Sequence, residues 1–469
     1  MIIMSDATKE LRERLFYKKQ NGVDFMSEQE LKACDEFCEG YKSFLFENKT
    51  EREFAKSALA LAKENGFKKF DKFAGKLNAG DKVYYFNRNK AIILCVKGTR
   101  PIIDGVRISA AHIDSPRLDL KQVPVYEDGN LGFFKTHYYG GIKKYQWTAI
   151  PLSLHGVICK NDGTSVEVKI GEDSADPKFC ITDILPHLGS EQMSGKAADI
   201  VKGEQLNVVI GSRPFKDDEE SERIKLNILN ILFEKYGVVE RDFLSAELEL
   251  VPAFTVDDIG FDRSLIGGYG HDDRVCSYPA MKAIFDIEEA PEYTAVTVLT
   301  DKEETGSDGN TGLNSSYLKY FISDLARLEG CEGRDVLSNS KCLSADVNAA
   351  FDPTWPTPFE KKNASFINEG VCVTKFTGAR GKAGTSDASA EYVSFVKALM
   401  ENNGVLWQSG ELGKVDAGGG GTVAMYIANL DVDVIDVGVP VLSMHSPYEV
   451  VSKIDTYMAY KAFKVFFTK

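Results

Sequence analysis

Residues 294–306 read Thr-Ala-Val-Thr-Val-Leu-Thr-Asp-Lys-Glu-Glu-Thr-Gly, an apolar run that ends in two adjacent glutamates. The first half is typical of a buried strand, and a segment of helical periodicity follows at 317–328. The same order returns at 342–345 with a helix at 386–402, and at 432–437 before a C-terminal helix. This alternation predicts an α/β fold in which helices cover both faces of a sheet.

The N-terminal part of the chain extends this pattern. Capping boxes at 27–30 (Ser and Glu) and 50–53 (Thr and Glu) each open a segment with apolar residues at helical spacing. Strand-like apolar runs follow, and the run at 106–110 places His112 at the carboxyl end of a strand. The strands predicted in the first hundred residues are therefore expected to belong to the same sheet, with the two helices packed against it.

The pattern of predicted secondary structure changes between about residues 118 and 250. Alternating strands such as 165–170 appear there, with an Asp162-Gly163 turn signal and one charged helix at 218–236. A chain of 469 residues also exceeds the size at which a single core stops growing. We predict a discontinuous catalytic domain, residues 1–118 and 251–469, and an inserted strand-rich domain, residues 119–250. Strand edges need cover, so the insertion is expected to mediate oligomerisation.

Composition excludes several classes of protein. A formal charge of −14 with dispersed Lys and Arg argues against nucleic acid as a partner. Nine cysteines without CxxC pairs look like reduced small hydrophobes. The first ten residues have no leader-type apolar region, and no apolar run approaches 18 residues. We expect a cytoplasmic protein without a membrane segment.

The adjacent glutamates indicate metal-dependent hydrolysis, in which Glu304 binds a metal and Glu303 stays free to take a proton from the attacking water. Each alone is a weak signal, but other metal-capable residues also follow apolar runs or a Gly-rich turn, and strand carboxyl ends share one crevice in an open α/β sheet. These further candidates are His112, Asp272, Asp346 and His445.

Two histidines and three carboxylates could hold two divalent metals. Zinc suits such donors best, and cobalt or manganese can also bind them. We choose Asp272 as the bridging carboxylate. Asp114, two residues after His112, is placed to accept the second ring N–H of that histidine, although an aspartate there can also be a simple turn or cap residue.

The motifs also carry a resemblance to a known family. Together they resemble the M18 family of dinuclear zinc aminopeptidases, the aspartyl aminopeptidase group. The matching motifs are Ala111-His-Ile-Asp-Ser-Pro-Arg117, Gly270-His-Asp-Asp-Arg274, Glu303-Glu-Thr-Gly-Ser307, Ser344-Ala-Asp346 and Ser443-Met-His-Ser446, with Tyr138-Tyr-Gly-Gly141 and Asp183-Ile-Leu-Pro-His-Leu188 in the inserted block.

The resemblance implies roles for the same residues: His112, Asp272, Glu304, Asp346 and His445 as ligands, Glu303 as general base and Asp114 as the orienting carboxylate. It also implies a cis peptide after Asp272 and a large homo-oligomer that is often dodecameric. It would allow His137 to contribute to a neighbouring subunit's site, with a structural role as the alternative. One motif departs from the aspartyl group. His271-Asp-Asp-Arg-Val275 stands where Arg-Leu-Asp-Asn-Leu is usual and is closer to M42 peptidases, so Asp273 stays an alternative bridge and a preference for acidic substrates stays open.

The leading prediction is a dinuclear metallo-aminopeptidase that removes N-terminal residues from peptides. A related enzyme acting on acyl-amino acids or C-terminal residues would use the same metals. A catalytically inactive scaffold is disfavoured, because the five predicted ligands and the predicted base Glu303 are all present. The basic group Lys375, Arg380 and Lys382 either meets an acidic substrate side chain or forms a solvated face.

Overall fold

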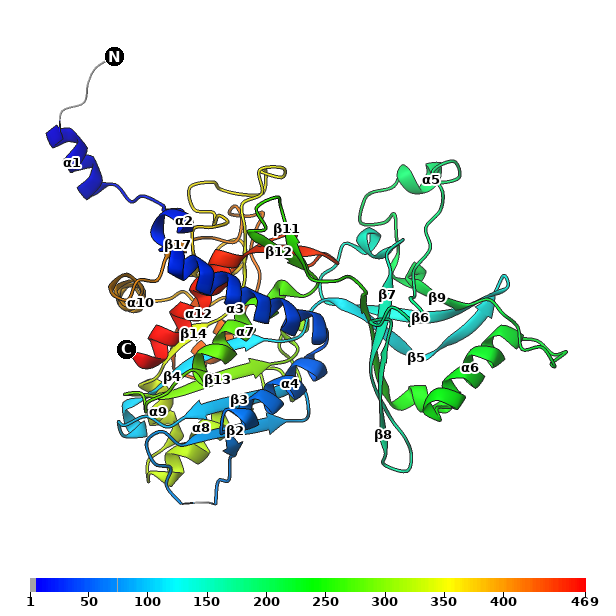
Figure 1. Cartoon of the computed structure of the whole chain (residues 1–469), viewed down its shortest axis with the longest axis horizontal. Helices are drawn as coiled ribbons and strands as arrows, with labels where there is room; N and C mark the ends of the chain where they lie inside the picture. Colours follow the sequence, from blue (N-terminus) through cyan, green and yellow to red (C-terminus); the bar gives the residue numbers. More distant parts are fainter. Residues whose placement is uncertain (1–5, 74) are drawn as a thin grey trace, which may run out of the picture.

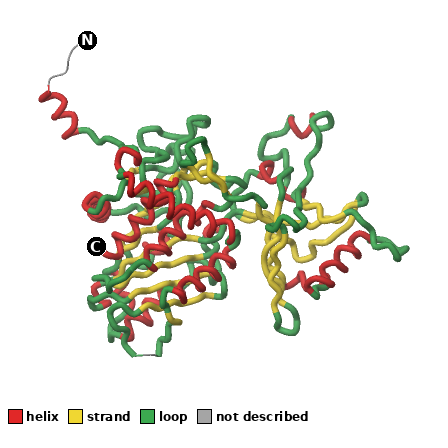
Figure 2. Tube along the Cα trace, viewed as in Figure 1, coloured by secondary structure: helices red, strands yellow, loops and turns green. Residues whose placement is uncertain are grey.

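The computed structural model describes residues 6–73 and 75–469, which form two lobes joined side by side (Figure 1). One lobe carries helices around a large sheet, and the other consists mainly of strands (Figure 2). Residues 1–5, on which part of the expectation of no leader rests, lie outside the described residues. Within the described part of the chain, no helix combines the length and apolarity that a bilayer crossing requires.

A nine-stranded sheet forms the centre of the larger lobe. Its four middle strands, β13, β4, β14 and β18, are mutually parallel, so their carboxyl ends lie along one edge. The strands in spatial order are β1 (Lys68–Lys69), β2 (Lys82–Asn87), β3 (Ala91–Val96), β13 (Thr294–Thr300), β4 (Val106–His112), β14 (Lys341–Ser344), β18 (Asp433–Gly438), β16 (Val371–Thr374) and β17 (Trp407–Ser409).

Helices cover both faces of this sheet, as the alternation predicted. Along β3, Ile92 and Leu94 belong to one core and Ile93 to the other, because successive side chains of a strand point to opposite faces. The first core takes side chains from α3 (Glu28–Glu47), α4 (Glu51–Glu64), α7 (His271–Phe285), α10 (Ala390–Asn402) and α12 (Lys453–Thr468), and the second from α8 (Tyr317–Leu328), α9 (Gly333–Ser338) and α11 (Ala424–Ala428).

Capping decides where the main helices begin. Both predicted capping boxes are present at the starts of α3 and α4. The helix predicted at 386–402 begins later, at Ala390, because the Ser389 side chain accepts a hydrogen bond from the Tyr392 N–H and acts as the N-cap. The N-terminal α1 (Asp6–Leu15) and α2 (Gly22–Phe25) were not predicted.

The smaller lobe contains a six-stranded sheet in which all neighbouring strands are antiparallel. The helix predicted at 218–236 is shorter, since Glu222 has a left-handed backbone (φ 60°) and the helix starts after it. The strands in spatial order are β8 (Ser165–Ile170), β7 (Leu152–Cys159), β10 (Ala246–Pro252), β5 (Arg117–Asp128), β6 (Leu131–Tyr139) and β9 (Asn207–Gly211), accompanied by α5 (Ser190–Met193) and α6 (Arg223–Tyr236).

A third, five-stranded sheet lies where the two lobes meet. We expected 432–437 to be the last strand, which is wrong, because two further strands follow it; each is too short to give a periodic signal. The strands in order are β11 (Asp257–Ile259), β12 (Leu265–Gly268), β20 (Glu449–Ser452), β19 (Pro440–Leu442) and β15 (Asn348–Ala349). His445 lies on the loop between β19 and β20.

Short 3-10 helices complete the secondary structure of the described residues. The turn that matters for the site is η5 (Glu303–Thr305), directly after β13. The others are η1 (Ile102–Asp104), η2 (Lys144–Trp147), η3 (Gly203–Gln205) and η4 (Glu240–Ser245).

Candidate metal centre

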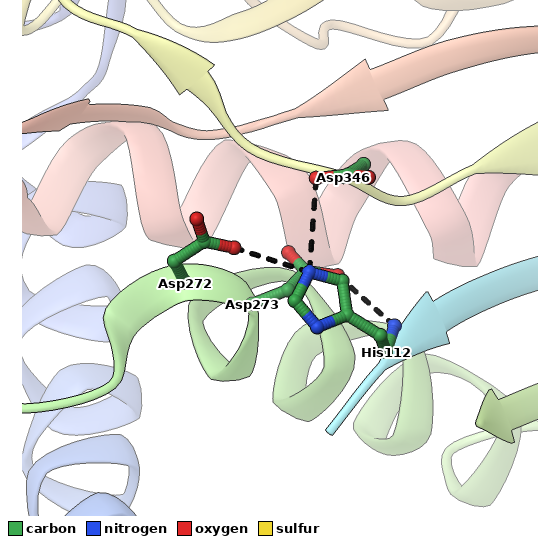
Figure 3. A group of neighbouring side chains, drawn as sticks. All are labelled: His112, Asp272, Asp273 and Asp346. Carbon is green, nitrogen blue, oxygen red and sulfur yellow. Dashed lines mark hydrogen bonds and ion pairs between the residues drawn. The ribbon is translucent and has the colours of Figure 1, made fainter. Parts of the chain in front are cut away.

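Segments far apart in the sequence meet at the carboxyl edge of the parallel strands. His112 is the last residue of β4, Asp346 follows β14 by two residues, and the adjacent glutamates lie in η5 after β13. Asp272 comes from the start of α7. His112, Asp272 and Asp346 therefore face one another from three different elements (Figure 3).

The side chains fall into two groups that share one carboxylate. His112 Nε2 lies 3.1 Å from Asp272 Oδ1 and 3.9 Å from Asp346 Oδ1. On the other side, His445 Nε2 lies 3.2 Å from Asp272 Oδ2 and 3.5 Å from Glu304 Oε2. Asp272 thus presents one oxygen to each imidazole, and the five predicted ligands are all brought together.

Asp273, the alternative bridge, is oriented differently from Asp272. The peptide bond between them is cis, as the family resemblance implied. Asp273 is completely buried, and its Oδ2 accepts a hydrogen bond from the backbone N–H of His112 at 3.2 Å (Figure 3). One of its carboxylate oxygens still lies within 4.8 Å of ligand atoms of His112, Asp272 and Asp346.

Asp114 connects the histidine to the glutamate turn. Its Oδ1 lies 3.4 Å from His112 Nδ1 and accepts the Glu303 N–H at 3.2 Å. Its Oδ2 accepts the Glu304 N–H at 3.2 Å and the Tyr139 hydroxyl at 2.7 Å. The His112 Nδ1 also lies 3.1 Å from the backbone oxygen of Asp114. One buried carboxylate therefore holds both a ring and a turn in place.

Sequence reasoning missed Glu449, the first residue of β20. Its Oε1 accepts the His445 N–H at 2.7 Å and its Oε2 accepts the Asp272 N–H at 3.1 Å, so it ties the backbones of two candidate ligands together. The residue is 1% exposed. In the sequence, Glu449 is only a glutamate that stands four residues after His445 and before two valines. This pattern is too common to identify a functional residue.

Burial and crowding of carboxylates perturb the titration of the site. Burial, reinforced by Asp114 and Asp272 against the opposing effect of His112, raises the pKa of Glu303 to about 7. Burial and the charge of Asp272 raise the pKa of Glu304 well above its usual range. For His445, burial favours the neutral ring, but Asp272 and Glu304 outweigh it and raise the pKa to about 10. The cluster is short of positive charge.

The donor set fits divalent metal ions. Asp272 Oδ1, Asp273 Oδ1 and Glu304 Oε1 are buried and find no hydrogen-bond donor among the described residues. Buried carboxylate oxygens without a donor are costly unless a cation neutralises them. Imidazole nitrogens and carboxylate oxygens are the ligands of zinc sites that need no thiolate.

A hollow of about 670 Å³ opens beside Glu304. It is lined by Thr305, by β5 residues 119–122 and by the end of β6 from His137 to Gly140. A larger hollow of about 850 Å³, lined by aromatic residues including Phe70, Tyr317 and Tyr320, contains none of the candidate ligands. Of these two hollows, only the smaller one is lined by a candidate ligand.

The basic group and His137 are not members of the ligand groups, although His137 lines the hollow beside Glu304. Lys375 and Lys382 both pair with Asp387, at 3.4 and 2.8 Å, so the basic group is partly neutralised. His137 is exposed, and its Nδ1 lies 2.9 Å from the backbone oxygen of Tyr138. His155 and His271 are buried in hydrogen-bonded positions and serve the structure.

Comparisons with known proteins agree with the geometry. The model of a family described as aminopeptidase I zinc metalloprotease (M18) matches residues 44–467. A probable M18 family aminopeptidase 1 from Clostridium acetobutylicum is 46% identical over 96% of this chain and 98% of its own. The crystal structure of an M18 family aminopeptidase from Thermotoga maritima matches with a TM-score of 0.92 and 42% identity, over 97% of this chain and 100% of its own.

A more distant structure shares the fold. The structure described as the mApe1 dodecamer of S. cerevisiae has a TM-score of 0.75 and 20% identity, over 92% of this chain and 96% of its own.

Proposed function

This chain belongs to the M18 family of zinc aminopeptidases, enzymes that hydrolyse peptide bonds, and we propose that it does so with two metal ions that share Asp272. The observation that carries the proposal is the Asp272 carboxylate, which has one oxygen 3.1 Å from His112 Nε2 and the other 3.2 Å from His445 Nε2. Co-catalytic metals about 3.5 to 4 Å apart need such a bridging carboxylate.

In this assignment His112, Asp272 and Asp346 would hold one ion, and Asp272, Glu304 and His445 would hold the other. The orientation of Asp273 toward the His112 backbone supports Asp272 as the bridge. Zinc is the metal in the family's description, and cobalt or manganese would suit the same ligands. Asp114 orients His112 by accepting at its Nδ1 side.

Zinc bound here would supply Lewis-acid chemistry, which polarises a scissile carbonyl and lowers the pKa of water from about 15.7 toward about 7. Glu303 is the proton carrier in our proposal: it takes a proton from the attacking water and returns it to the leaving amine. Burial raises the pKa of Glu303, and a cation bound nearby would lower it, which favours the ionised form that takes up the proton. Asp114 fixes the backbone N–H of Glu303 and so sets the position of this group.

The substrate is a peptide with a free N-terminus. The excess of carboxylates at the centre favours a protonated α-amino group, and the hollow beside Glu304 gives room for the first side chain. We include acidic residues among the N-terminal residues that the enzyme would remove. Lys121 and His137 line the same hollow and supply the polar groups that would meet them.

Residues 119–250 form an inserted oligomerisation domain in this proposal, with residues 1–118 and 251–469 as the catalytic domain. Large apolar side chains are exposed on the smaller lobe, among them Leu188 at 69% and Met193 at 73%. Such exposure supports a homo-oligomer, since the apolar side chains need cover. The shared fold with the yeast dodecamer supports a dodecamer, and His137 would then face a neighbouring subunit.

We also propose a cytoplasmic location. All nine cysteines, each within the described part of the chain, are free thiols, and free thiols are typical of reducing compartments.

A substrate panel tests the proposed function. Purified protein loaded with zinc should cleave aminoacyl anilides, with Asp, Glu, Leu and Met compared at the first position, and should leave N-blocked peptides intact. Preferential cleavage of acyl-amino acids or C-terminal residues would favour the related hydrolase instead. Metal analysis of the same sample should give two zinc ions per chain.

A further inference from the structure

We propose that the segment Tyr139-Gly140-Gly141, which consists of the last residue of β6 and the two glycines after it, positions both halves of the metal centre. This segment belongs to the smaller lobe, whereas every candidate ligand lies outside that lobe, on or beside the nine-stranded and five-stranded sheets. The inference rests on the metal centre proposed above. It means that the smaller lobe completes the site of its own subunit, apart from any role in assembly.

The first contact is the Tyr139 hydroxyl on Asp114. The phenol donates to Asp114 Oδ2 at 2.7 Å. The same oxygen accepts the Glu304 N–H at 3.2 Å, and the other oxygen faces His112 Nδ1 at 3.4 Å. Without the phenol, the carboxylate is held, among the described residues, only by the two N–H groups of the η5 turn, so its position opposite the His112 ring is less firmly fixed.

The second contact is the Gly141 carbonyl on His445. The Nδ1 of His445 lies 2.8 Å from Gly141 O. A carbonyl can only accept, so Nδ1 carries a proton, and a ring that gives up its second proton to bind a metal presents the lone pair of Nε2 toward Asp272 and Glu304. This is the tautomer that a metal-binding histidine needs, and the partner of its other nitrogen is what selects it.

Between these contacts, Gly140 packs directly against a candidate ligand. It has a left-handed backbone (φ +74°), and a Cβ there would lie 3.1 Å from Glu304 Oε2 and 3.3 Å from both Glu304 Cβ and Pro116 Cγ. A side chain at this position would therefore be strained and would press on Glu304. Because Gly140 and Gly141 have no Cβ, the backbone can pack closely against Glu304 and His445.

The segment is anchored at its base by buried charges. The Arg117 guanidinium lies over the Tyr139 ring, 3.9 Å from its centroid. Arg117 is itself held by Glu51 of α4 at 3.3 Å and by Glu249 of β10 at 3.3 Å, and it is 5% exposed. Tyr139 is thus fixed to a charged network that joins the two lobes, which makes it a rigid support for Asp114.

Replacing Tyr139 by Phe tests the first contact, and Tyr460→Phe is the matched control. Tyr460 also donates to a carboxylate at 2.7 Å, Asp286 Oδ2, but it lies on α12, and Asp286 caps the end of α7 opposite to Asp272. Zinc affinity of the metal-free full-length protein is measured by competition with a chromogenic chelator. We expect Y139F to bind zinc about tenfold more weakly, as losses of such supporting partners typically do, and Y460F to stay within about twofold of wild type.

Kinetics at saturating zinc separates positioning from a general loss of structure. Y139F should lower kcat about tenfold with KM within about twofold, and the thermal midpoint of the metal-free form should match that of Y460F. Zinc affinity and kcat equal to those of Y460F would overturn the inference while leaving the zinc peptidase intact. A wild-type protein that binds no zinc would instead overturn the proposed function and the inference with it.

Gly140→Ala is the second variant, and it depends on packing rather than on the phenol. We expect it to weaken zinc binding at least as much as Y139F, because the added methyl meets Glu304. If Y139F does not fold, G140A carries the test, with Gly163→Ala as its control; Gly163 is also left-handed (φ +85°) but has no atom within 4 Å of an added Cβ. Unchanged zinc affinity in G140A would count against the positioning role.

Discussion

Two regions of this molecule bury several charged side chains, and the pKa values of Glu51 in one region and Glu303 in the other are shifted in opposite directions. At the junction of the lobes, Glu51 lies 3.3 Å from Lys90 Nζ and 3.3 Å from Arg117. Burial opposes its charge, but Arg117 and Lys90 outweigh burial and bring its pKa to about 2. At the metal centre, burial and neighbouring carboxylates instead raise the pKa of Glu303 to about 7.

The difference separates a structural network from a site. The junction carries its own cations, Arg117 and Lys90, so Glu51 stays ionised without any ligand. Burial raises the pKa of Glu249 in the same network, where Arg117 opposes this effect. The groups that could hold a metal at the centre contain five carboxylates against two histidines. A buried surplus of one sign is the feature that calls for an ion, whereas a buried balanced cluster holds the fold together.

The strongest test of this contrast is removal of the shared carboxylate. Asp272→Asn should bind fewer than two zinc ions per chain and lose activity by at least about a thousandfold, since several kcal/mol of stabilisation are lost and about 1.4 kcal/mol is tenfold. Zinc content and aminopeptidase rate are the measurements. Asp273→Asn is the control, because an amide oxygen can still accept the His112 N–H. If Asp273→Asn loses zinc and Asp272→Asn keeps it, Asp273 is the bridge.

Removal of the proton carrier should affect chemistry and spare the metals. Glu303→Gln should lower kcat by at least about a hundredfold with two zinc ions retained, because the amide cannot take up the proton. Glu289→Gln makes the same change of charge on an exposed residue and should be silent. Retained activity in Glu303→Gln would show that another group carries the proton.

At the junction, the corresponding change should cost stability. Glu51→Gln leaves Arg117 and Lys90 buried with less countercharge, and loss of one buried partner typically costs about 3 to 5 kcal/mol. Urea unfolding of the metal-free protein measures it. Glu247→Gln removes a half-exposed partner of the same Lys90 and should cost less than about 1 kcal/mol. Equal costs for the two variants would mean that burial does not set the strength of this network.

Much of the metal centre could be predicted because its residues follow strands. Apolar runs locate the ends of β4, β13 and β14, and parallel strands must deliver His112, Glu304 and Asp346 to one edge. The α/β class with helices on both faces was confirmed for the same reason, since long periodic segments dominate the larger lobe.

The supporting contacts could not be predicted. Glu449, Tyr139 and Gly141 act through hydrogen bonds that depend on how the lobes and the third sheet are placed, and no local pattern records that. The third sheet was missed because strands such as β19 and β15 have only three and two residues. The start of α6 was placed too early because the left-handed backbone at Glu222 has no sequence signal in a run of charges.

The smallest expected effect concerns a third buried cluster, formed by His155, Glu53 and Glu172. The contribution of this cluster to stability should depend on pH. His155 is fully buried, with Nδ1 2.8 Å from Glu53 and Nε2 2.8 Å from Glu172. Burial favours the neutral ring, but these carboxylates outweigh it and raise the pKa of His155 above its usual value. A raised folded-state pKa stabilises the protein fully below the unfolded value of about 6.5, and this stabilisation is lost as pH rises through the folded value.

His155→Gln removes the titrating ring but keeps a polar side chain. We expect it to be less stable than wild type by about 1.5 kcal/mol at pH 6, the typical worth of a hydrogen bond to a charged group, and the difference should shrink steadily toward pH 9. Parallel urea titrations of the two proteins at each pH measure the difference, in which shared contributions such as that of Lys49 near Glu172 cancel. A difference that stays constant or grows with pH would show that His155 is neutral when folded, so that the cluster resembles the unbalanced metal centre more than the balanced junction.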